Sequence, residues 1–232
     1  MTEKKITETP IAVAIDGPSG AGKSTLARSV ARELGFVYVD TGAIYRTVGC
    51  QARRLGVDPG DAAAVIALLP KTRVELAYGA DGLQRMYLNG EDVTDEIRLP
   101  EISLYASRVS AVPEVRAFLM DMQRQAALRH NVIMDGRDIG TVVLPQAQVK
   151  IFLTASPEDR AARRCAELRE RGIEKDYGQL LEEIRERDYN DSHRAASPLR
   201  PAEDAVCLDT TGNSFETSRR QILEIIKERI GE

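Results

Sequence analysis

Short runs of apolar residues recur along the chain and predict the strands of a buried sheet. Residues 11–16 (IAVAID) are apolar almost throughout and precede Gly-Pro, a pattern typical of a strand that is buried on both faces. Residues 24–34 then carry apolar side chains along one helical stripe, and residues 37–40 (VYVD) form a second short run. Strand, helix and strand in this order predict a right-handed βαβ unit of a parallel sheet.

The remainder of the chain continues this alternation. Three more buried runs lie at residues 132–135, 149–153 and 205–208. Helical patterns lie near residues 113–128, 157–171, 177–194 and 214–230. Five strands joined by crossover helices predict an α/β fold with an open, doubly wound parallel sheet flanked by helices. The 232 residues suffice for one such domain with an insertion.

One stretch departs from the alternation. Residues 72–98 alternate apolar and polar positions, with turn signals at residues 79–82 and at Asn89 and Gly90. This pattern predicts a small antiparallel β insertion in the larger fold. A helical segment near residues 100–111 leads back to the main sheet.

The composition is that of an ordinary globular protein, with 43% hydrophobic and 29% charged residues. No apolar run approaches the roughly 20 residues that cross a bilayer, and residues 1–10 are polar. We therefore expect a short disordered lead-in, no signal peptide, a cytoplasmic location and, without any heptad run, a monomer. The isolated cysteines and the two histidines predict neither a disulfide framework nor a metal site of their own: Cys50, Cys165, Cys207, His130 and His193.

Charge narrows the class of partner. The net charge of −4 argues against general binding of nucleic acid, which leaves a basic footprint. Of the cationic residues 25 are Arg and 7 are Lys, and the planar guanidinium suits bidentate recognition of phosphate. A codon bias of the source genome would explain the ratio equally well, so the positions of the arginines matter more than their number.

A phosphate-binding motif follows the first predicted strand. Residues 17–24 (GPSGAGKS) match G-x-x-x-x-G-K-[ST] and lie between a buried strand and an amphipathic helix, as a P-loop requires. In such a loop backbone N–H groups surround phosphate oxygens, the lysine reaches the β- and γ-phosphates, and the serine hydroxyl coordinates Mg²⁺. The predicted ATP site comprises Gly17, Pro18, Ser19, Gly20, Ala21, Gly22, Lys23, Ser24 and Thr25, with Ser24 as the Mg²⁺ ligand.

The motif alone leaves several classes open. A glycine-rich turn without a ligand is the structural alternative. GTPases, ATPase motors, small-molecule kinases and nucleotide kinases all use a P-loop. A GTPase also needs N-K-x-D, and the sequence contains no Asn-Lys dipeptide, which argues against that class.

Two more strand ends carry polar groups, and ligands of open α/β sheets bind at the carboxyl ends of the strands. Thr41 begins a helix after the second strand, with Arg46 about one turn in. Arg137 and Asp138 follow closely on the apolar run at residues 132–135. We expect these groups to face the same crevice as the P-loop. Alternatively, Thr41 is an ordinary helix N-cap, and Arg137 and Asp138 form a structural ion pair.

The helix predicted at residues 177–194 has a buried stripe that turns from apolar to charged. Its positions are Leu180, Leu181, Ile184, Arg187, Asp188, Asp191 and Arg194. Buried charges are costly without partners, which a phosphate and a sugar hydroxyl would supply, unless the helix simply leaves the core. The preceding helix gathers arginines next to residues 171–176, which indicates either a mobile lid or a solvated face: Arg160, Arg163, Arg164 and Arg171.

Five motifs resemble, in order and spacing, those of the bacterial-type cytidylate kinases: GPSGAGKST, DTGAIYR, DVTDEIR at the end of the insertion, DGRDIGTVV and IRERDYNDSHR. The resemblance covers about residues 10–230. It implies a P-loop kinase with its core at residues 11–60 and 112–230. It also implies a nucleoside-monophosphate-binding insertion at about 61–111 and an Arg-bearing lid at about 160–176. The expected preference for cytosine comes from the resemblance alone.

The resemblance also implies a role for each matching residue. Lys23, Arg137 and Arg187 would be catalytic, and Arg163 would join the P-loop in binding ATP. The acceptor phosphate would be held by Arg46, Arg137 and Arg194, the cytosine by Ser107, Arg116 and Asp138, and the ribose by Arg187 and Asp191. Thr41 stands where the family often has Ser, so its hydroxyl is expected to serve the same purpose.

The implied reaction transfers a phosphoryl group from ATP to CMP or dCMP. A phosphate monoester is mostly ionised at pH 7, so no general base is needed, and positioning and charge stabilisation would carry catalysis. One alternative is a P-loop kinase for UMP, AMP or a hydroxyl acceptor such as shikimate, with Asp40 or Asp135 as base. Another is a regulatory protein that binds ATP without transferring phosphate.

Overall fold

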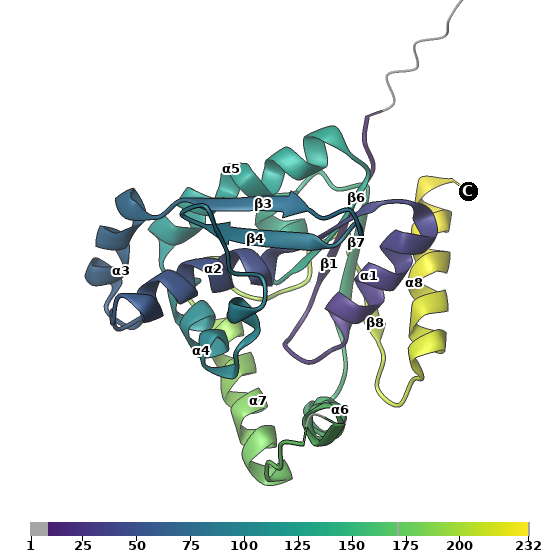
Figure 1. Cartoon of the computed structure of the whole chain (residues 1–232). Helices are drawn as coiled ribbons and strands as arrows, with labels where there is room; N and C mark the ends of the chain where they lie inside the picture. The colour runs from purple at the N-terminus through teal and green to yellow at the C-terminus, as the bar shows by residue number, and fades with distance from the viewer. Residues whose placement is uncertain (1–8, 171, 232) are drawn as a thin grey trace, which may run out of the picture.

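A five-stranded parallel sheet forms the centre of the computed structural model, which describes residues 9–170 and 172–231 (Figure 1). In spatial order the strands are β2 (Val37–Asp40), β6 (Val132–Gly136), β1 (Ala12–Asp16), β7 (Val149–Thr154) and β8 (Val206–Asp209). Because β1 lies between β6 and β7, the P-loop emerges near the middle of the sheet. Most of the predicted lead-in, residues 1–8, lies outside the described residues.

Both faces of the sheet are buried, as the continuous apolar runs predict. Along β1, Ala12 and Ala14 face one hydrophobic cluster, whereas Val13 and Ile15 face another. Helices cover each face: α2 (Thr41–Arg54) and α5 (Pro113–Arg129) pack on the first cluster, and α1 (Lys23–Leu34) and α8 (Phe215–Ile230) pack on the second (Figure 1). This confirms the predicted doubly wound architecture.

The insertion contains a three-stranded antiparallel sheet of β3 (Val74–Tyr78), β4 (Gln84–Leu88) and β5 (Glu91–Asp92). Asn89 and Gly90 have φ angles of +52° and +87°, as the tight turn between β4 and β5 requires. Helix α3 (Ala62–Leu68) and the 3₁₀ turn η1 (Leu69–Lys71) precede this sheet, and the 3₁₀ turn η2 (Glu96–Arg98) and α4 (Pro100–Val109) follow it. Buried residues of β4 and α4 belong to the same hydrophobic cluster as those of α2, so the insertion shares the core of the larger fold.

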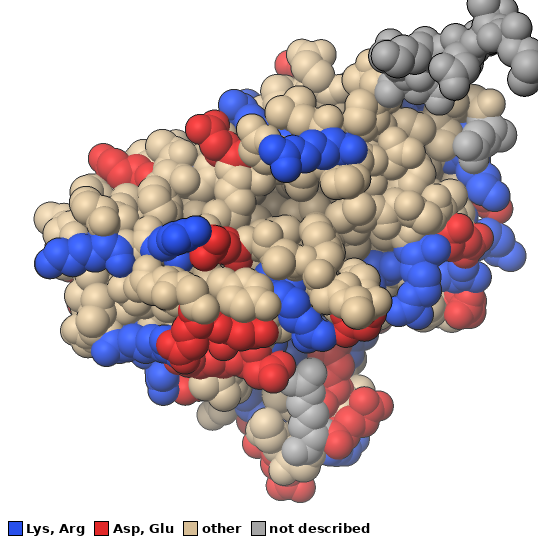
Figure 2. Space-filling view, turned by 45° about the horizontal axis from the view of Figure 1, so that its top comes forward, with Lys and Arg blue, Asp and Glu red and all other residues tan. Residues whose placement is uncertain are grey.

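Helices α6 (Pro157–Glu170) and α7 (Tyr177–His193) pack against each other at the lower end of the molecule in Figure 1. No described helix is both long enough and apolar enough to span a membrane. On the face in Figure 2, cationic and anionic side chains are interspersed, without a broad patch of one sign. That nucleic acid is not a partner stays a prediction.

The sequence located the five strands of the central sheet to within one residue at each end, but it missed several local features. Helix α3 was not predicted, nor was the single π-helical turn η3 (Ile139–Val143) after β6. The alternative interpretation of Thr41, an ordinary helix N-cap, was wrong. The N-cap of α2 is Asp40, whose carboxylate accepts the N–H of Ala43 at 2.9 Å, whereas the Thr41 hydroxyl donates to the carbonyl of Asp135 at 2.7 Å.

A buried carboxylate at the end of β1 holds the π-helical turn. Asp16 accepts hydrogen bonds from the backbone N–H groups of Ile139 and Gly140, each at 2.8 Å. Burial raises the pKa of Asp16 to about 6, although both amide donors act in the opposite direction. Because η3 directly follows Arg137 and Asp138, Asp16 fixes the position of the charged segment at the end of β6.

Replacing Asp16 with alanine is expected to lower the free energy of unfolding by about 1–3 kcal/mol at pH 8, because two buried N–H groups lose their acceptor. A carboxyl whose pKa is raised on folding stabilises most below its unfolded pKa and loses that contribution as the pH rises through about 6. The loss should therefore be about 1 kcal/mol larger at pH 5 than at pH 8. Urea denaturation at both pH values measures it.

Asp209→Ala is the matched control, since Asp209 accepts one backbone N–H, from Thr211 at 2.8 Å, but lies exposed. Hydrogen bonds from Thr211 lower the pKa of Asp209, so the loss for Asp209→Ala should not be larger at pH 5 than at pH 8. A loss for Asp16→Ala that is equal at the two pH values, or larger at pH 8, would contradict the account of Asp16.

Candidate active site

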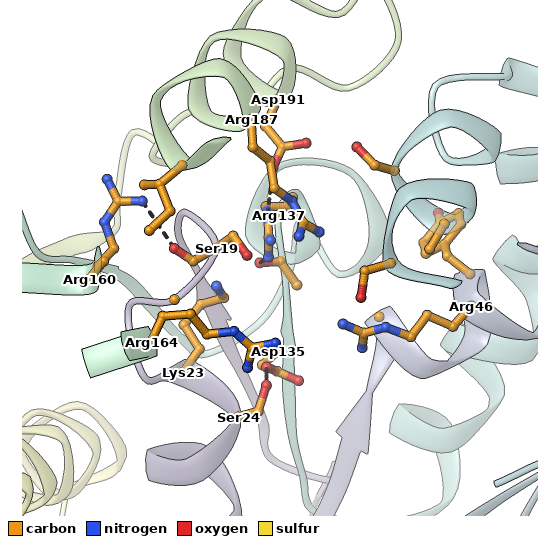
Figure 3. A pocket seen from close by; sticks show the side chains of 18 of the residues that line it. Ser19, Lys23, Ser24, Arg46, Asp135, Arg137, Arg160, Arg164, Arg187 and Asp191 are labelled. Carbon is orange, nitrogen blue, oxygen red and sulfur yellow. Dashed lines mark hydrogen bonds and ion pairs between the residues drawn. The ribbon is translucent and has the colours of Figure 1, made fainter. Parts of the chain in front are cut away.

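A cavity of about 600 Å³ opens beyond the carboxyl ends of β1, β2 and β6. The P-loop lines one side of it, and α2, α4 and the segment after β6 line the opposite side, while α6 and α7 contribute further side chains. Figure 3 shows Arg46, Arg137, Arg164 and Arg187 reaching into this space from four different elements. The three strand ends singled out by the sequence thus face one crevice, as predicted.

The P-loop places a buried lysine at the start of α1. Gly20 and Gly22 have φ angles of +76° and +83°, which side chains larger than glycine rarely tolerate. The Nζ atom of Lys23 donates to the carbonyl of Pro18 at 2.7 Å, and the side chain is only 5% exposed. Burial and the neighbouring Arg137 lower the pKa of Lys23 well below its usual value. An ammonium whose partner is a neutral carbonyl would form a stronger, charge-assisted hydrogen bond with a phosphate oxygen.

The predicted ATP residues divide into two groups. Ser19, Gly20, Gly22, Lys23, Ser24 and Thr25 line the cavity. Gly17, Pro18 and Ala21 lie behind it and shape the loop: a side chain at Gly17 would meet the carbonyl oxygen of Leu153 at 1.9 Å, and Ala21 is fully buried against α1.

Asp135, near the end of β6, accepts hydrogen bonds from two hydroxyl groups. Ser24 Oγ donates to one carboxylate oxygen at 2.7 Å, and the Tyr38 hydroxyl donates to the other at 3.0 Å. Burial, reinforced by the charge of Asp40, raises the pKa of Asp135 to about 6. Nothing in the sequence pattern pointed to Tyr38, which lies 97 positions from Asp135.

The donor set at Ser24 and Asp135 fits Mg²⁺, which prefers hydroxyl, carboxylate and phosphate oxygens. Within the described part of the chain, no group of three or more His, Cys, Asp or Glu residues is placed to hold a metal ion. A metal at this site would therefore complete its coordination with ligand phosphates and water, as Mg²⁺ normally does at ATP sites.

Three arginines converge opposite the P-loop. Arg137 donates from Nε to Asp191 at 3.0 Å, and this pair joins the end of β6 to α7. Burial and repulsion from Arg137 lower the pKa of Arg187 to about 10, and its Nε atom has no hydrogen-bond partner among the described residues. Burial also lowers the pKa of Arg46, although Asp40 acts against this. Such mutual repulsion of buried cations favours binding of an anion between them.

A second ion pair lies deeper in the same cavity. Arg116 and Asp138, only 5% and 3% exposed, are joined by a short ion pair. Arg116 also donates to the carbonyl of Ser110 at 3.1 Å and to the hydroxyl of Ser197 at 3.1 Å, so its orientation is fixed. Nη2 of Arg194 lies 4.0 Å from Asp138. Ser107 lines the cavity as well, and the structure thus brings together all residues that the resemblance assigned to the acceptor.

The arginines of α6 differ in burial and in their hydrogen-bond partners. Arg160, which the sequence placed in a mobile lid or on a solvated face, is 2% exposed and bound on several sides. Arg163 lines the cavity, but its guanidinium donates to the carbonyl of Thr210 at 2.7 Å and pairs with Asp159 at 2.5 Å. Arg164, which the site prediction left out, also lines the cavity, and its guanidinium donates to Glu167 at 3.0 Å. Arg171 lies outside the described residues.

The charged stripe of α7 finds its partners within the protein. Leu180 is buried, as the apolar part of the stripe predicts. Asp188 pairs with Arg160, and Asp191 pairs with Arg137. Burial disfavours ionisation of Asp191, but Arg137 and Arg187 outweigh it and lower the pKa of this carboxyl. The carboxylates of the stripe are therefore already neutralised, whereas Arg187 remains available to an anion.

A cationic wall that faces a P-loop across one cavity provides for two phosphate groups, and on this fold it defines a P-loop kinase. A comparison with family models agrees: the model described as cytidylate kinase matches residues 13–228. The chain belongs to the cytidylate kinase family, which confirms the resemblance seen in the motifs.

Individual relatives support the assignment over nearly the whole chain. A cytidylate kinase of Caldicellulosiruptor bescii is 49% identical over 215 residues, which are 93% of this chain and 95% of that protein. One of Pelotomaculum thermopropionicum is 52% identical over 211 residues, 91% of this chain and 93% of that one. A solved structure of an uncharacterized protein from Eubacterium ventriosum covers 94% of this chain and 98% of its own, with 12% identity and a TM-score of 0.51, and supports the fold alone.

Proposed function

We propose that this protein transfers the γ-phosphoryl group of ATP to CMP and dCMP, producing CDP and dCDP. The observation that carries the proposal is the convergence of Arg46, Arg137 and Arg187 across one cavity from the P-loop. Two phosphate sites that face each other suit a phosphorylated acceptor better than a neutral one. The names of the relatives, all cytidylate kinases, supply the identity of the base.

On the donor side, the P-loop amides and Lys23 hold the ATP phosphates. Ser24, oriented by Asp135, would hold Mg²⁺ together with those phosphates, and the ion would neutralise part of their charge. On α6, Arg163 and Arg164 both line the cavity and would meet the transferring group; each is paired with a carboxylate of its own helix, Asp159 and Glu167 respectively.

On the acceptor side, Arg46, Arg137 and Arg194 hold the phosphate of CMP. Ser107, Arg116 and Asp138 read the cytosine edge, and their fixed geometry favours selectivity because a mismatched base leaves buried polar groups unpaired. Thr41, Arg187 and Asp191 complete this half of the site, with Asp191 near the ribose.

No proton transfer to a protein base is required, because a phosphate monoester with a pKa near 6 already presents an ionised oxygen. Asp135 is occupied by two hydroxyl donors, and Asp40 caps α2 and pairs with Arg98 at 2.9 Å. The arginines offset the repulsion between two anions and stabilise the charge of a loose transition state.

The domain boundaries follow from this assignment. Residues 61–111 are the insertion that binds the nucleoside monophosphate, since α4 brings Ser107 to the cavity. The lid spans about residues 160–176, with Arg160 as its fixed base rather than a moving part. The cytoplasmic location and the monomeric state remain predictions.

Measurement of ADP release with CMP, dCMP, UMP, AMP and shikimate tests the function. We expect the highest kcat/KM with CMP and dCMP. A preference for UMP, AMP or shikimate would replace the proposed acceptor. Binding of ATP without transfer to any of the five would favour a regulatory nucleotide-binding protein.

Asp191→Ala is expected to reduce kcat/KM for CMP more than for dCMP, because only CMP offers a 2′-hydroxyl. Both substrates should also share a common loss, since Asp191 holds Arg137 in place. The ratio of the two kcat/KM values, compared with the wild-type ratio, isolates the ribose contact. Equal losses on both nucleotides would show that Asp191 acts through Arg137 alone.

A further inference from the structure

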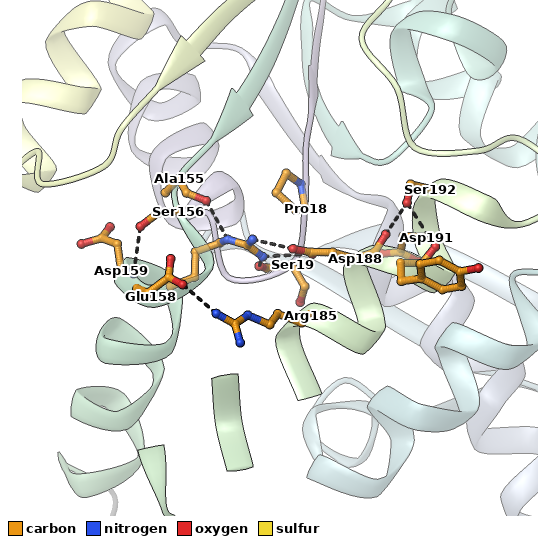
Figure 4. A network of polar contacts seen from close by, with 12 residues as sticks. Pro18, Ser19, Ala155, Ser156, Glu158, Asp159, Arg185, Asp188, Asp191 and Ser192 are labelled. Atoms are coloured by element: carbon orange, nitrogen blue, oxygen red, sulfur yellow. Dashed lines mark hydrogen bonds and ion pairs between the residues drawn. The ribbon is translucent and has the colours of Figure 1, made fainter. Parts of the chain in front are cut away.

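Arg160, in the first turn of α6, donates hydrogen bonds to Ser19 of the P-loop and to Asp188 of α7, both of which are labelled in Figure 4. Its side chain is almost wholly buried, with the whole residue 2% exposed. Nε donates to the carbonyl of Ala155 at 2.9 Å, at the end of β7, and Nη1 donates to the carbonyl of Ser19 at 3.0 Å, in the P-loop. Nη1 and Nη2 also donate to the two carboxylate oxygens of Asp188 on α7, at 3.0 and 2.5 Å.

These contacts make one planar group the link between the two halves of the site. A guanidinium that binds a carboxylate through two parallel hydrogen bonds fixes both distance and orientation, which a lysine does not. Asp188 directly follows Arg187 on α7 and precedes Asp191 by less than one turn. A shift of Asp188 relative to Ser19 would therefore displace the acceptor-side groups relative to the phosphate loop.

We propose that Arg160 and Asp188 are positioning residues that set the spacing between the P-loop and α7, and with it the alignment of donor and acceptor phosphates. This rests on the proposed function. Arg160 borders the cavity, but its guanidinium is bound to protein oxygens, and Asp188 lies outside the lining, so the pair acts on substrates through Ser19, Arg187 and Asp191.

A purely structural role, in which the pair only fastens α6 to α7, is the competing explanation. The chain offers a matched control for it. Arg185 on α7 pairs with Glu158 on α6 at 3.0 Å, but both side chains are about half exposed, and neither touches the P-loop or the cavity (Figure 4). Asp188→Asn and Arg185→Gln therefore each remove an ion pair between the same two helices.

Asp188→Asn is expected to lower kcat/KM for CMP at least ~10-fold, since small misplacements of reacting groups cost up to about 10²-fold. The KM for ATP should stay within about twofold, because Lys23 and the Arg160–Ser19 contact remain. Arg185→Gln should leave both parameters near wild type. Asp188→Glu restores the charge and should recover most of the lost kcat.

Thermal melting followed by circular dichroism shows which variants are folded. If Asp188→Asn is not folded, Arg160→Lys replaces it, since lysine keeps the charge but lacks the planar fork that binds both oxygens of Asp188, and the same loss of kcat is expected. Folded Asp188→Asn protein with the kinetics of Arg185→Gln, or with a KM for ATP raised about 10-fold, would overturn the inference. Wild-type protein that fails to phosphorylate CMP would instead count against the proposed function.

Discussion

Replacing Lys23 with alanine is expected to lower kcat for CMP phosphorylation about 10²- to 10³-fold, the range seen when one preorganised charge stabiliser is removed. The ammonium is buried beside Pro18 and near Arg137, so it is already desolvated and positioned before substrate arrives. Charge that develops on the transferring group then meets a fixed cation rather than reorganising water. The ADP-release assay measures the effect.

Lys150→Ala is the matched control. Lys150 likewise donates to a proline carbonyl, that of Pro145 at 2.7 Å, and pairs with Asp204 at 2.9 Å, but it does not line the cavity. Its loss should leave kcat near wild type. Near-normal turnover of Lys23→Ala would contradict the assignment of the P-loop as the catalytic phosphate site.

Arg187→Met is expected to stabilise the unliganded protein while lowering kcat about 10²-fold or more, as for other deleted charge stabilisers. Burial and Arg137 lower the pKa of Arg187 to about 10, so the protonated group weakens the fold at every pH below that value, and less above it. Methionine keeps much of the packing without the charge, and the gain should be about 1–3 kcal/mol at pH 7. Urea denaturation and the ADP-release assay measure the two effects.

Arg185→Met provides the comparison on the same helix. Arg185 is exposed and paired with Glu158 and Glu182, so its replacement should neither stabilise the fold nor lower kcat. A destabilised Arg187→Met protein would show that this guanidinium is satisfied in the unliganded state. A stabilised protein with normal turnover would remove Arg187 from the catalytic residues.

The sheet was predictable because its strands are short apolar runs, and the two central strands β1 and β6 are buried along their whole length. The P-loop was predictable because its function needs fixed residue types at fixed spacing, and its neighbours had to be a strand and a helix. The β insertion was predictable from the Asn89-Gly90 turn, because the positive φ angles of such a turn favour few residue types.

The partners within the site were harder to predict. A sequence shows that Arg160 is charged, but not that Asp188, 28 positions away, lies opposite it in the fold. The hydrogen bond between Tyr38 and Asp135 was equally hidden, because Tyr38 lies within an apolar strand and nothing local marks its hydroxyl as part of the site. Asp40 took the capping role expected of Thr41, because the hydroxyl of Thr41 turns toward the carbonyl of Asp135. Such choices depend on tertiary packing, which no local pattern encodes.

Transfer of label from [γ-³²P]ATP tests whether CMP is the phosphoryl acceptor, because it follows the phosphoryl group itself. The protein, Mg²⁺, labelled ATP and an equal concentration of CMP are incubated, and the products are separated by chromatography. We expect the label in CDP, with little inorganic phosphate, because the arginine-lined half of the cavity holds the acceptor. Label that appears as inorganic phosphate at the same rate with and without CMP would contradict it.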